Sequence, residues 1–211
     1  MKNTRILFIT LLALLGVAST LQGISKIDQV QAAKANIAVL ANTSGSSRGG
    51  GPVAELNDGL TPNSVPDGMR HRRPQRLTAQ WFQYDWVNPV PIDEIAIFWY
   101  NFDNLAKLPQ AYRLKYWDGK EYVPVKNPVG MEMVNNQFNS TTFDQVTTTR
   151  LRLEVDSVDR VASTILEFKV FKPVNSPAIA PVITAGGDRI VMSGGKTYLS
   201  AGIKSLDPLK M

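Results

Sequence analysis

The sequence predicts an all-β domain with the architecture of a β-sandwich or jelly roll. Short segments in which apolar and polar residues alternate recur along the chain, and a helical period is nearly absent. Gly and Pro residues separate these segments at the spacing typical of sandwiches. The chain has 211 residues and no Cys, so it can bury a sizeable core but must do so without disulfides.

Two aromatic-rich strands are expected in the first half of this domain. Residues 77–86 and 92–100 both alternate between two faces. Burying a large ring contributes about 1.5–3 kcal/mol, so we place Trp81 and Trp99 in the core. A short apolar run at residues 36–44 precedes both strands and is closed by turn-forming residues.

The second half of the domain continues the strand pattern. Strands are expected at residues 111–125, as a hairpin, and at residues 148–155 and 165–173. Asp118 and Gly119 give a strong signal for a two-residue turn in that hairpin. In the last strand, alternation places Glu167 on the face of Ile165 and Phe171. A carboxylate on such a face needs an ion pair or a metal.

The chain is expected to have four parts. These are a signal peptide and polar lead (1–33), the β-sandwich (34–173), a Pro-containing linker (174–181) and a short, truncated β segment (182–211). Lys2 and Arg5 precede an uncharged apolar run of signal-peptide length, which is followed by small residues. Cleavage after Ser19, later cleavage after Ala32 and an uncleaved anchor all remain open. We expect a secreted protein, periplasmic or extracellular.

The order of motifs resembles one known family. NIAVLANTS, ELNDG, AQWFQYDWVNPVPIDEIAIFWY, LPQAYRLKYWDGKEYVPV, FDQVTTTRLRLEV and ILEFKVF follow one another over about residues 34–173. This series resembles the galactose-binding-like jelly roll of the discoidin, or coagulation factor 5/8 type C, family. It is most similar to the version appended to secreted glycoside hydrolases of Bacteroidetes. PVITAGGDRIVMSGGKTYLSAGI resembles the opening strands of an immunoglobulin-like unit.

The resemblance implies a non-catalytic module whose loops at one end of the sandwich bind ligands, commonly sugars. One candidate surface follows the strand at residues 92–100, where the Tyr100 ring could stack on a sugar while Asn101 and Asp103 bind its hydroxyls. A second lies in the basic loop at residues 67–76. Its candidate ligand-binding residues are Arg70, His71, Arg72 and Arg73.

A structural calcium site is also expected. Asp58 lies on a Gly turn, the Ser64 hydroxyl follows it, and Glu167 is a carboxylate from the last strand. Ca²⁺ takes several hard oxygen ligands of these kinds. The resemblance implies the same arrangement, since that family often holds a structural Ca²⁺ between such a loop and a glutamate of the terminal strand.

Other function classes have less support. The sequence has no serine-nucleophile elbow, no HExxH and no Gly-rich phosphate loop, and nothing in it pairs two carboxylates across a cleft. The formal charge of +5 falls to +3 without Lys2 and Arg5, which weakens a nucleic-acid signal. We therefore expect no enzyme, no nucleic-acid partner and no stable membrane insertion. The expected partner is a polysaccharide or glycan, with a glycoside hydrolase as a further candidate; a spacer or protein-interaction module without glycan affinity is the alternative.

Overall fold

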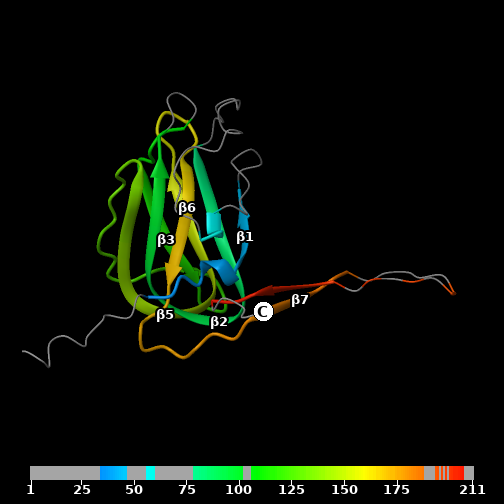
Figure 1. Cartoon of the computed structure of the whole chain (residues 1–211). Helices are drawn as coiled ribbons and strands as arrows, with labels where there is room; N and C mark the ends of the chain where they lie inside the picture. The colour runs from blue at the N-terminus through cyan, green and yellow to red at the C-terminus, as the bar shows by residue number, and fades with distance from the viewer. Residues whose placement is uncertain are drawn as a thin grey trace, which may run out of the picture. The chain divides into compact units, whose positions relative to one another are not determined.

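The computed structural model describes residues 34–46, 56–59, 78–101, 106–187, 193, 194, 196, 198 and 200–206. These residues all belong to the compact unit that begins at Lys34. Its elements, coloured along the chain in Figure 1, are η1 (Ala38–Leu40), β1 (Asn42–Gly45), β2 (Ala79–Tyr100), β3 (Ala111–Trp117), β4 (Tyr122–Pro124), β5 (Gln137–Asp156), β6 (Thr164–Phe171), β7 (Val182–Ala185) and β8 (Ala201–Lys204). The segment expected to be a signal peptide lies outside the described residues.

Two long bent strands, β2 and β5, build both layers of the sandwich. The antiparallel sheet has the order β1-β2-β5-β3-β4, and β6 also pairs with β2. The first half of β2 pairs with β1 and with the second half of β5, while its second half pairs with β6 and with the first half of β5. Both strands curve at the lower end of Figure 1, so one sheet folds over onto itself. The predicted all-β sandwich is confirmed.

The bend in β2 falls where its sequence cannot continue a regular ladder. The pairing with β5 is irregular between Asp85 and Val90 and again between Ile92 and Glu94. Pro89 and Pro91 occupy this stretch. Because Pro has no backbone N–H, it is tolerated in a sheet mainly at edges and bulges. The prolines therefore mark the corner at which β2 passes from one layer to the other.

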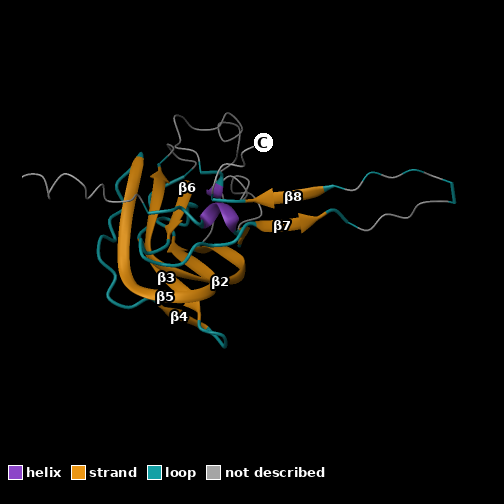
Figure 2. Cartoon of the chain, turned by 60° about the horizontal axis from the view of Figure 1, so that its bottom comes forward, coloured by secondary structure: helices purple, strands orange, loops and turns teal. Residues whose placement is uncertain are grey.

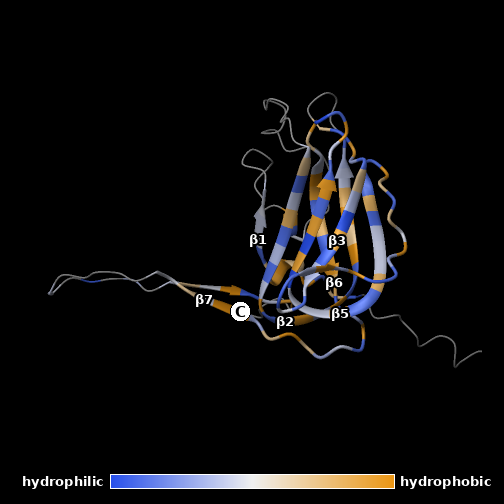
Figure 3. Cartoon of the chain, turned by 180° about the vertical axis from the view of Figure 1, so that it is seen from behind, coloured by the Kyte–Doolittle hydropathy of each residue, from blue (hydrophilic) through white to orange (hydrophobic). Residues whose placement is uncertain are grey.

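The core lies between the two layers and is rich in aromatic rings. Trp99 is fully buried, as predicted, and its ring centroid lies 5.6 Å from that of Tyr112 in the facing layer. Tyr84 stacks on Phe168 across the sandwich with centroids 4.9 Å apart. Buried apolar and exposed polar positions alternate along the strands, as the banded colouring of Figure 3 shows. The aromatic residues of these strands thus mainly fill the sandwich.

Trp81 is an exception, and its prediction as a core residue is wrong. Phe82, Tyr84 and Trp86 are the buried apolar residues of this half of β2, so Trp81 lies on the opposite, outer face and is only half-buried. Both faces of this strand carry aromatic residues, so alternation alone could not decide which one is inside.

Two local details also differ from the sequence prediction. In β6 the ladder runs from Phe98 opposite Glu167 to Trp99 opposite Ile165, so one extra residue forms a bulge. The bulge moves Ile165 to the face opposite Glu167. The β3–β4 hairpin has a four-residue loop rather than a two-residue turn, because Trp117 pairs with Tyr122. Two consecutive backbone N–H groups in that loop donate to Asp118 Oδ1.

A second, two-stranded sheet follows the sandwich. β7 and β8 are antiparallel, with Ile183 opposite Ile203, and form the hairpin seen in Figure 2. Both isoleucines are exposed. The Lys204 ammonium donates to the carbonyl of Ala41 at 2.7 Å. No helix within the described part of the chain has the length and apolarity needed to cross a membrane.

Candidate functional site

One end of the sandwich gathers the ends of several strands. Both ends of β2 lie there because the strand runs down one layer and returns up the other, as Figure 1 shows. Tyr100 pairs with Thr164 at the start of β6, and the backbone N–H of Gln110 donates to the backbone carbonyl of Asp156 at the end of β5. We call this region the loop end and define it by Tyr100, Asn101, Lys107, Asp159 and Arg160.

Tyr100 and Asn101 lie at the end of the second half of β2, where the sequence predicted that this strand ends. Tyr100 is half-buried and Asn101 is exposed. The backbone N–H of Asn101 donates to Asn135 Oδ1 at 2.7 Å, which fixes the direction in which the chain leaves the strand. The other predicted ligand-binding residues lie outside the described residues, so their roles stay predictions. They are Asp103 and, in the basic loop, Arg70, His71, Arg72 and Arg73.

A tight turn at Asp159 and Arg160 is the part of the loop end that the sequence did not reveal. Val158 and Val161 form an isolated bridge around it, and both turn residues have a left-handed backbone, with φ of 51° and 61°. Residues other than Gly seldom adopt this conformation, which costs about 1–2 kcal/mol per residue. Non-glycine residues held in this way are enriched at functional sites. Without a Gly in the Val-Asp-Arg-Val segment, no sequence signal marked the turn.

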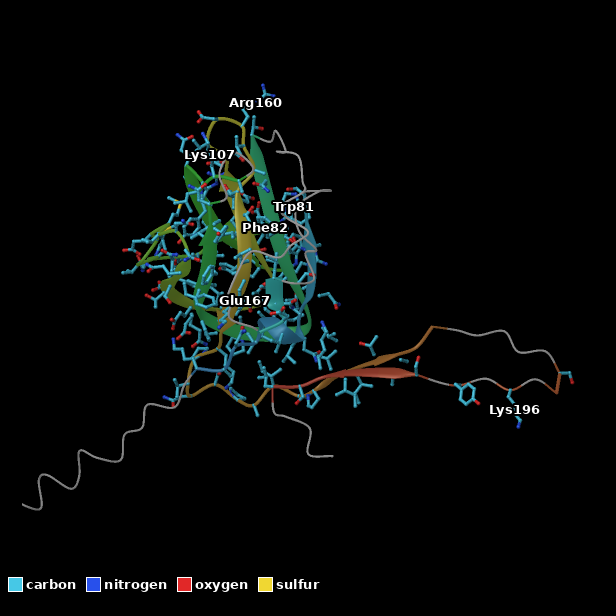
Figure 4. All side chains as sticks on the ribbon, turned by 45° about the horizontal axis from the view of Figure 1, so that its top comes forward. Trp81, Phe82, Lys107, Arg160, Glu167 and Lys196 are labelled. Atoms are coloured by element: carbon cyan, nitrogen blue, oxygen red, sulfur yellow. The ribbon has the colours of Figure 1, made fainter. Side chains whose placement is uncertain are left out.

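Lys107 and Gln80 hold this turn in place. The Lys107 ammonium lies 2.6 Å from Asp159 Oδ2, and its backbone N–H donates to the carbonyl of Ala162. The amide of Gln80 accepts from the N–H of Ser163 at 2.7 Å and donates to the Ser163 carbonyl. Arg160 lies at the extreme end of the sandwich beyond Lys107, as Figure 4 shows. The backbone of the turn that carries the exposed Arg160 is therefore held in place at the loop end.

A buried carboxylate lies on the flank of the sandwich, away from the loop end. Glu167 is fully buried, and neither of its carboxyl oxygens has a hydrogen-bond partner of normal geometry among the residues described. Burial, followed by the charge of Asp58, raises the pKa of Glu167 to about 8; Lys169 and the backbone N–H of Gly59 act in the opposite direction. Leaving such a group without a partner is costly.

The segment that carries Asp58 is fixed against the sandwich by buried polar groups. The Asn57 amide donates to the carbonyls of Ala38 and Ala41 at 2.6 and 3.2 Å. The Tyr84 hydroxyl contacts the Leu56 carbonyl at 2.9 Å. These hydrogen bonds hold the segment in the position that places Asp58 beside Glu167. Within the described ranges no three acidic or His side chains come together, and Ser64 lies outside them.

The described groups of the loop end are suited to binding. They are an aromatic hydroxyl, a backbone-anchored asparagine, a lysine and an arginine. Among the described residues, Asp159 of the loop end and the neighbouring Asp156 are held in ion pairs with Lys107 and Arg113. The Arg113 guanidinium holds the pKa of Asp156 below its usual value. Glycoside hydrolysis by two carboxyl groups needs one of them protonated, and this pairing opposes protonation of Asp156.

Comparison with known proteins supports the fold. The sequence matches no protein-family model and no curated protein. A structure of the beta-galactosidase BgaA of Streptococcus pneumoniae is similar with a TM-score of 0.51 and 19% identity, covering 64% of this chain and 92% of that one. A chitosan-binding module from a chitosanase/glucanase of Paenibacillus sp. IK-5 gives 0.49 and 14%, covering 65% and 98%. The family 32 carbohydrate-binding module of C. perfringens NanJ, solved with galactose, gives 0.47 and 18%, covering 66% and 98%. The similarity to the BgaA structure shows that the described chain shares its fold, a β-sandwich of the kind that the sequence resemblance implied.

Proposed function

We propose that this protein is a secreted, non-catalytic carbohydrate-binding module that works with a glycoside hydrolase. The observation that carries the proposal is the loop end, where a strained Asp159-Arg160 turn presents Arg160 next to Lys107 and the strand end at Tyr100. An aromatic ring next to fixed hydrogen-bond donors suits the apolar face and the hydroxyls of a sugar. The fold similarity to a beta-galactosidase structure supports the link with glycoside hydrolases.

The basic loop would extend this surface. Arg70, His71, Arg72 and Arg73 belong to the segment that precedes β2, which begins at Ala79 at the loop end. Arginine forks bind carboxylates or paired hydroxyls. Asp103 belongs to the segment that follows Tyr100 and would add a hydroxyl acceptor. We include these residues in the proposed surface because the chain enters and leaves β2 there.

The test is binding of the purified protein to a panel of polysaccharides and oligosaccharides. We expect Tyr100→Ala and Arg160→Ala each to weaken binding by about tenfold or more, because each removes a contact worth about 1–3 kcal/mol. Tyr198→Ala is the matched control for the tyrosine, since Tyr198 is 83% exposed on the segment between β7 and β8. Lys120→Ala, in the β3–β4 loop, controls for loss of a positive charge. A folded protein that binds no glycan would instead favour the spacer or protein-interaction role.

A structural calcium ion is part of the proposal. Asp58, Ser64 and Glu167 are the residues that would hold it. The fit rests on Glu167, whose two oxygens are buried without a hydrogen bond of normal geometry to a described residue. They lie beside the Asp58 carboxylate and the backbone N–H of Gly59. Bound Ca²⁺ would neutralise both charges and tie the residue 56–59 segment to β6. Its role would be to stabilise the fold, not to take part in chemistry.

Calcium is tested by thermal unfolding. We expect the melting temperature to rise with calcium and to fall with a chelator, since a ligand that binds only the folded state stabilises it. Asp58→Asn and Glu167→Gln should abolish the calcium response. Asp144→Asn, on the exposed part of β5, is the matched control and should keep it. Equal melting temperatures for the wild type with calcium and with chelator would contradict the site.

Export is also a proposal. The basic residues Lys2 and Arg5 followed by an apolar run of signal-peptide length support it. Expression of the full chain in a bacterial host, followed by cell fractionation and N-terminal sequencing, tests it. A processed protein in the periplasm or medium is expected, and an unprocessed protein in the cytoplasm would contradict it.

A further inference from the structure

The layer that contains the first half of β2, the second half of β5, β3 and β4 carries on its outer face a row of aromatic, arginine and amide or acidic side chains that the loop end does not use. Its residues come from four neighbouring strands, β2, β5, β3 and β4. We call it the outer-face row, and its members are Trp81, Gln83, Asp85, Arg150, Arg152, Trp117 and Tyr122.

Register places these residues together. Gln83 lies opposite Arg152 and Asp85 opposite Arg150, so all four share one face of the β2–β5 pair. Trp117 pairs with Tyr122 on the adjoining hairpin, and their ring centroids are 5.2 Å apart. At about 4.8 Å between neighbouring strands, four strands span roughly 14 Å. That is enough to contact a short oligosaccharide rather than one sugar ring.

Arg152 is the centre of this row. Its guanidinium lies 4.7 Å from the Trp81 ring and 3.8 Å from the Tyr122 ring, measured to the centroids. Nε and one terminal nitrogen both donate to Gln83 Oε1, at 3.0 and 2.7 Å. The Tyr122 hydroxyl donates to the same oxygen at 2.7 Å. Stacking and hydrogen bonds thus fix the guanidinium plane before any ligand arrives.

The charge of Arg152 has no carboxylate partner among the residues that the structure describes. Gln83 is neutral, and its amide in turn donates to Asp85, which pairs with Arg150 at 3.1 Å. A guanidinium has five N–H donors, and only two of those of Arg152 go to Gln83. The remaining donors include a terminal pair, which is the geometry that binds a carboxylate through two hydrogen bonds.

Other cations of the same face are already compensated. Arg113 binds Asp156 and Glu154, and Lys115 binds Glu154 at 2.9 Å. Arg150 is paired with Asp85 and lies over the Trp117 ring at 5.2 Å. Arg152 therefore differs from the other cations of this face in lacking a carboxylate partner among the described residues.

We propose that the outer-face row is a second glycan-binding surface, separate from the loop end, and that it takes a uronate-containing polysaccharide. A uronate carboxylate would bind the free edge of the Arg152 guanidinium. The half-buried rings of Trp81, Tyr122 and Trp117 would pack against the apolar faces of the sugars. The inference rests on the proposed carbohydrate-binding function but names a different surface.

The test compares polygalacturonate with its highly methyl-esterified form by isothermal titration calorimetry. Methyl esterification removes the carboxylate charge and keeps the sugar backbone. We expect the wild type to bind polygalacturonate at least about tenfold more tightly than the ester, since one charge-assisted hydrogen-bond pair is lost. Arg152→Gln and Trp117→Ala should each weaken polygalacturonate binding by a similar factor.

Three controls keep the result interpretable. Arg113→Gln makes the same charge change on the same face at a compensated residue and should leave binding unchanged. Tyr198→Ala, which removes an exposed tyrosine that belongs to neither surface, should also leave it unchanged. Arg152→Lys keeps the charge but loses the planar fork, so it should bind as weakly as Arg152→Gln. Circular dichroism and melting curves establish that each variant is folded.

The outcomes separate this inference from the proposed function. Failure of the folded wild type to bind polygalacturonate, while neutral glycans still bind, would overturn the outer-face site alone. Equal weakening by Arg113→Gln and Arg152→Gln would reveal general charge attraction and would overturn it too. Weakening by Tyr100→Ala but not by Arg152→Gln would move the uronate to the loop end. Absence of any glycan binding would contradict both proposals.

Discussion

Glu167 shows how a single side chain can report on the energetics of this fold. It is a fully buried carboxyl next to Asp58, and neither of its oxygens has a hydrogen bond of normal geometry to a described residue. Burial and that neighbouring charge favour its protonated form. In the absence of calcium, the group should therefore make the stability of the protein depend on pH.

The sign of this dependence follows from the raised pKa. The pKa of Glu167 rises from 4.5 to about 8 on folding, so between these values the folded state holds a proton that the unfolded state has released. In a chelator, the free energy of unfolding should fall as pH rises through this window, by at most about 1.4 kcal/mol per pH unit. Denaturant unfolding at pH 5, 6, 7 and 8 measures it.

Glu167→Gln should flatten that curve because it places a neutral amide of the same shape at the site. The variant should be more stable than the wild type at pH 8 in chelator, and the difference should shrink toward pH 5. The same change at Glu121, which is exposed in the β3–β4 loop, should alter neither end of the curve. Parallel pH profiles for Glu167→Gln and the wild type would show that Glu167 is ionised at neutral pH in the folded protein.

Single elements illustrate where function and stability oppose each other. The Asp159-Arg160 turn uses two left-handed residues that are not glycine. Arg160→Gly should raise the free energy of unfolding by about 0.5–1 kcal/mol, because the relief of backbone strain exceeds the added entropy of the unfolded chain. The same variant should lose glycan affinity with the side chain. Chemical denaturation and a binding isotherm on one protein preparation test both expectations, and a variant that is both less stable and still binding would contradict this account of the turn.

Gly130 allows the segment around Val129 to lie close along β5. Val129 bridges to Thr142, and Gly130 has a φ of +83°. A Cβ at this position would lie 2.4 Å from the Ser140 carbonyl oxygen, whereas one on Gly119, with a φ of +107°, would meet no atom within 4 Å. Gly130→Ala should therefore cost about 1–3 kcal/mol more than Gly119→Ala. If urea unfolding gave equal losses of stability for the two variants, the clash at Gly130 would contribute nothing beyond the backbone strain that both positions share.

Sequence reasoning identified these elements to different degrees for physical reasons. Period-two alternation is a strong local signal, so the strands of the sandwich could be predicted. Alternation does not say which face is buried, and Trp81 was assigned to the wrong one. The bulge in β6, which separates Ile165 from Glu167, depends on pairing with β2 and leaves no local mark. Arg160 escaped notice because its turn lacks the Gly that usually signals left-handed backbone.

The whole molecule offers two separate candidate surfaces on one sandwich. The loop end presents Arg160 and Tyr100 at the strand ends, while the outer-face row presents Arg152 on the sheet itself. Tyr100 and Asn101 could be named from sequence because they follow a predicted strand. The outer-face row could not, because it assembles residues from four strands that only the register brings together.

The most direct test of the central claim, glycan binding at the loop end, is a residue-resolved NMR titration of the isotope-labelled protein. Ligands should be the neutral glycan that binds most tightly in the panel and, separately, polygalacturonate. With the neutral glycan, we predict chemical-shift changes at the amides of Tyr100, Asn101, Lys107 and Arg160, with little change at Arg152 and Trp117. Shift changes confined to residues away from the loop end, or none at saturating glycan, would contradict the claim.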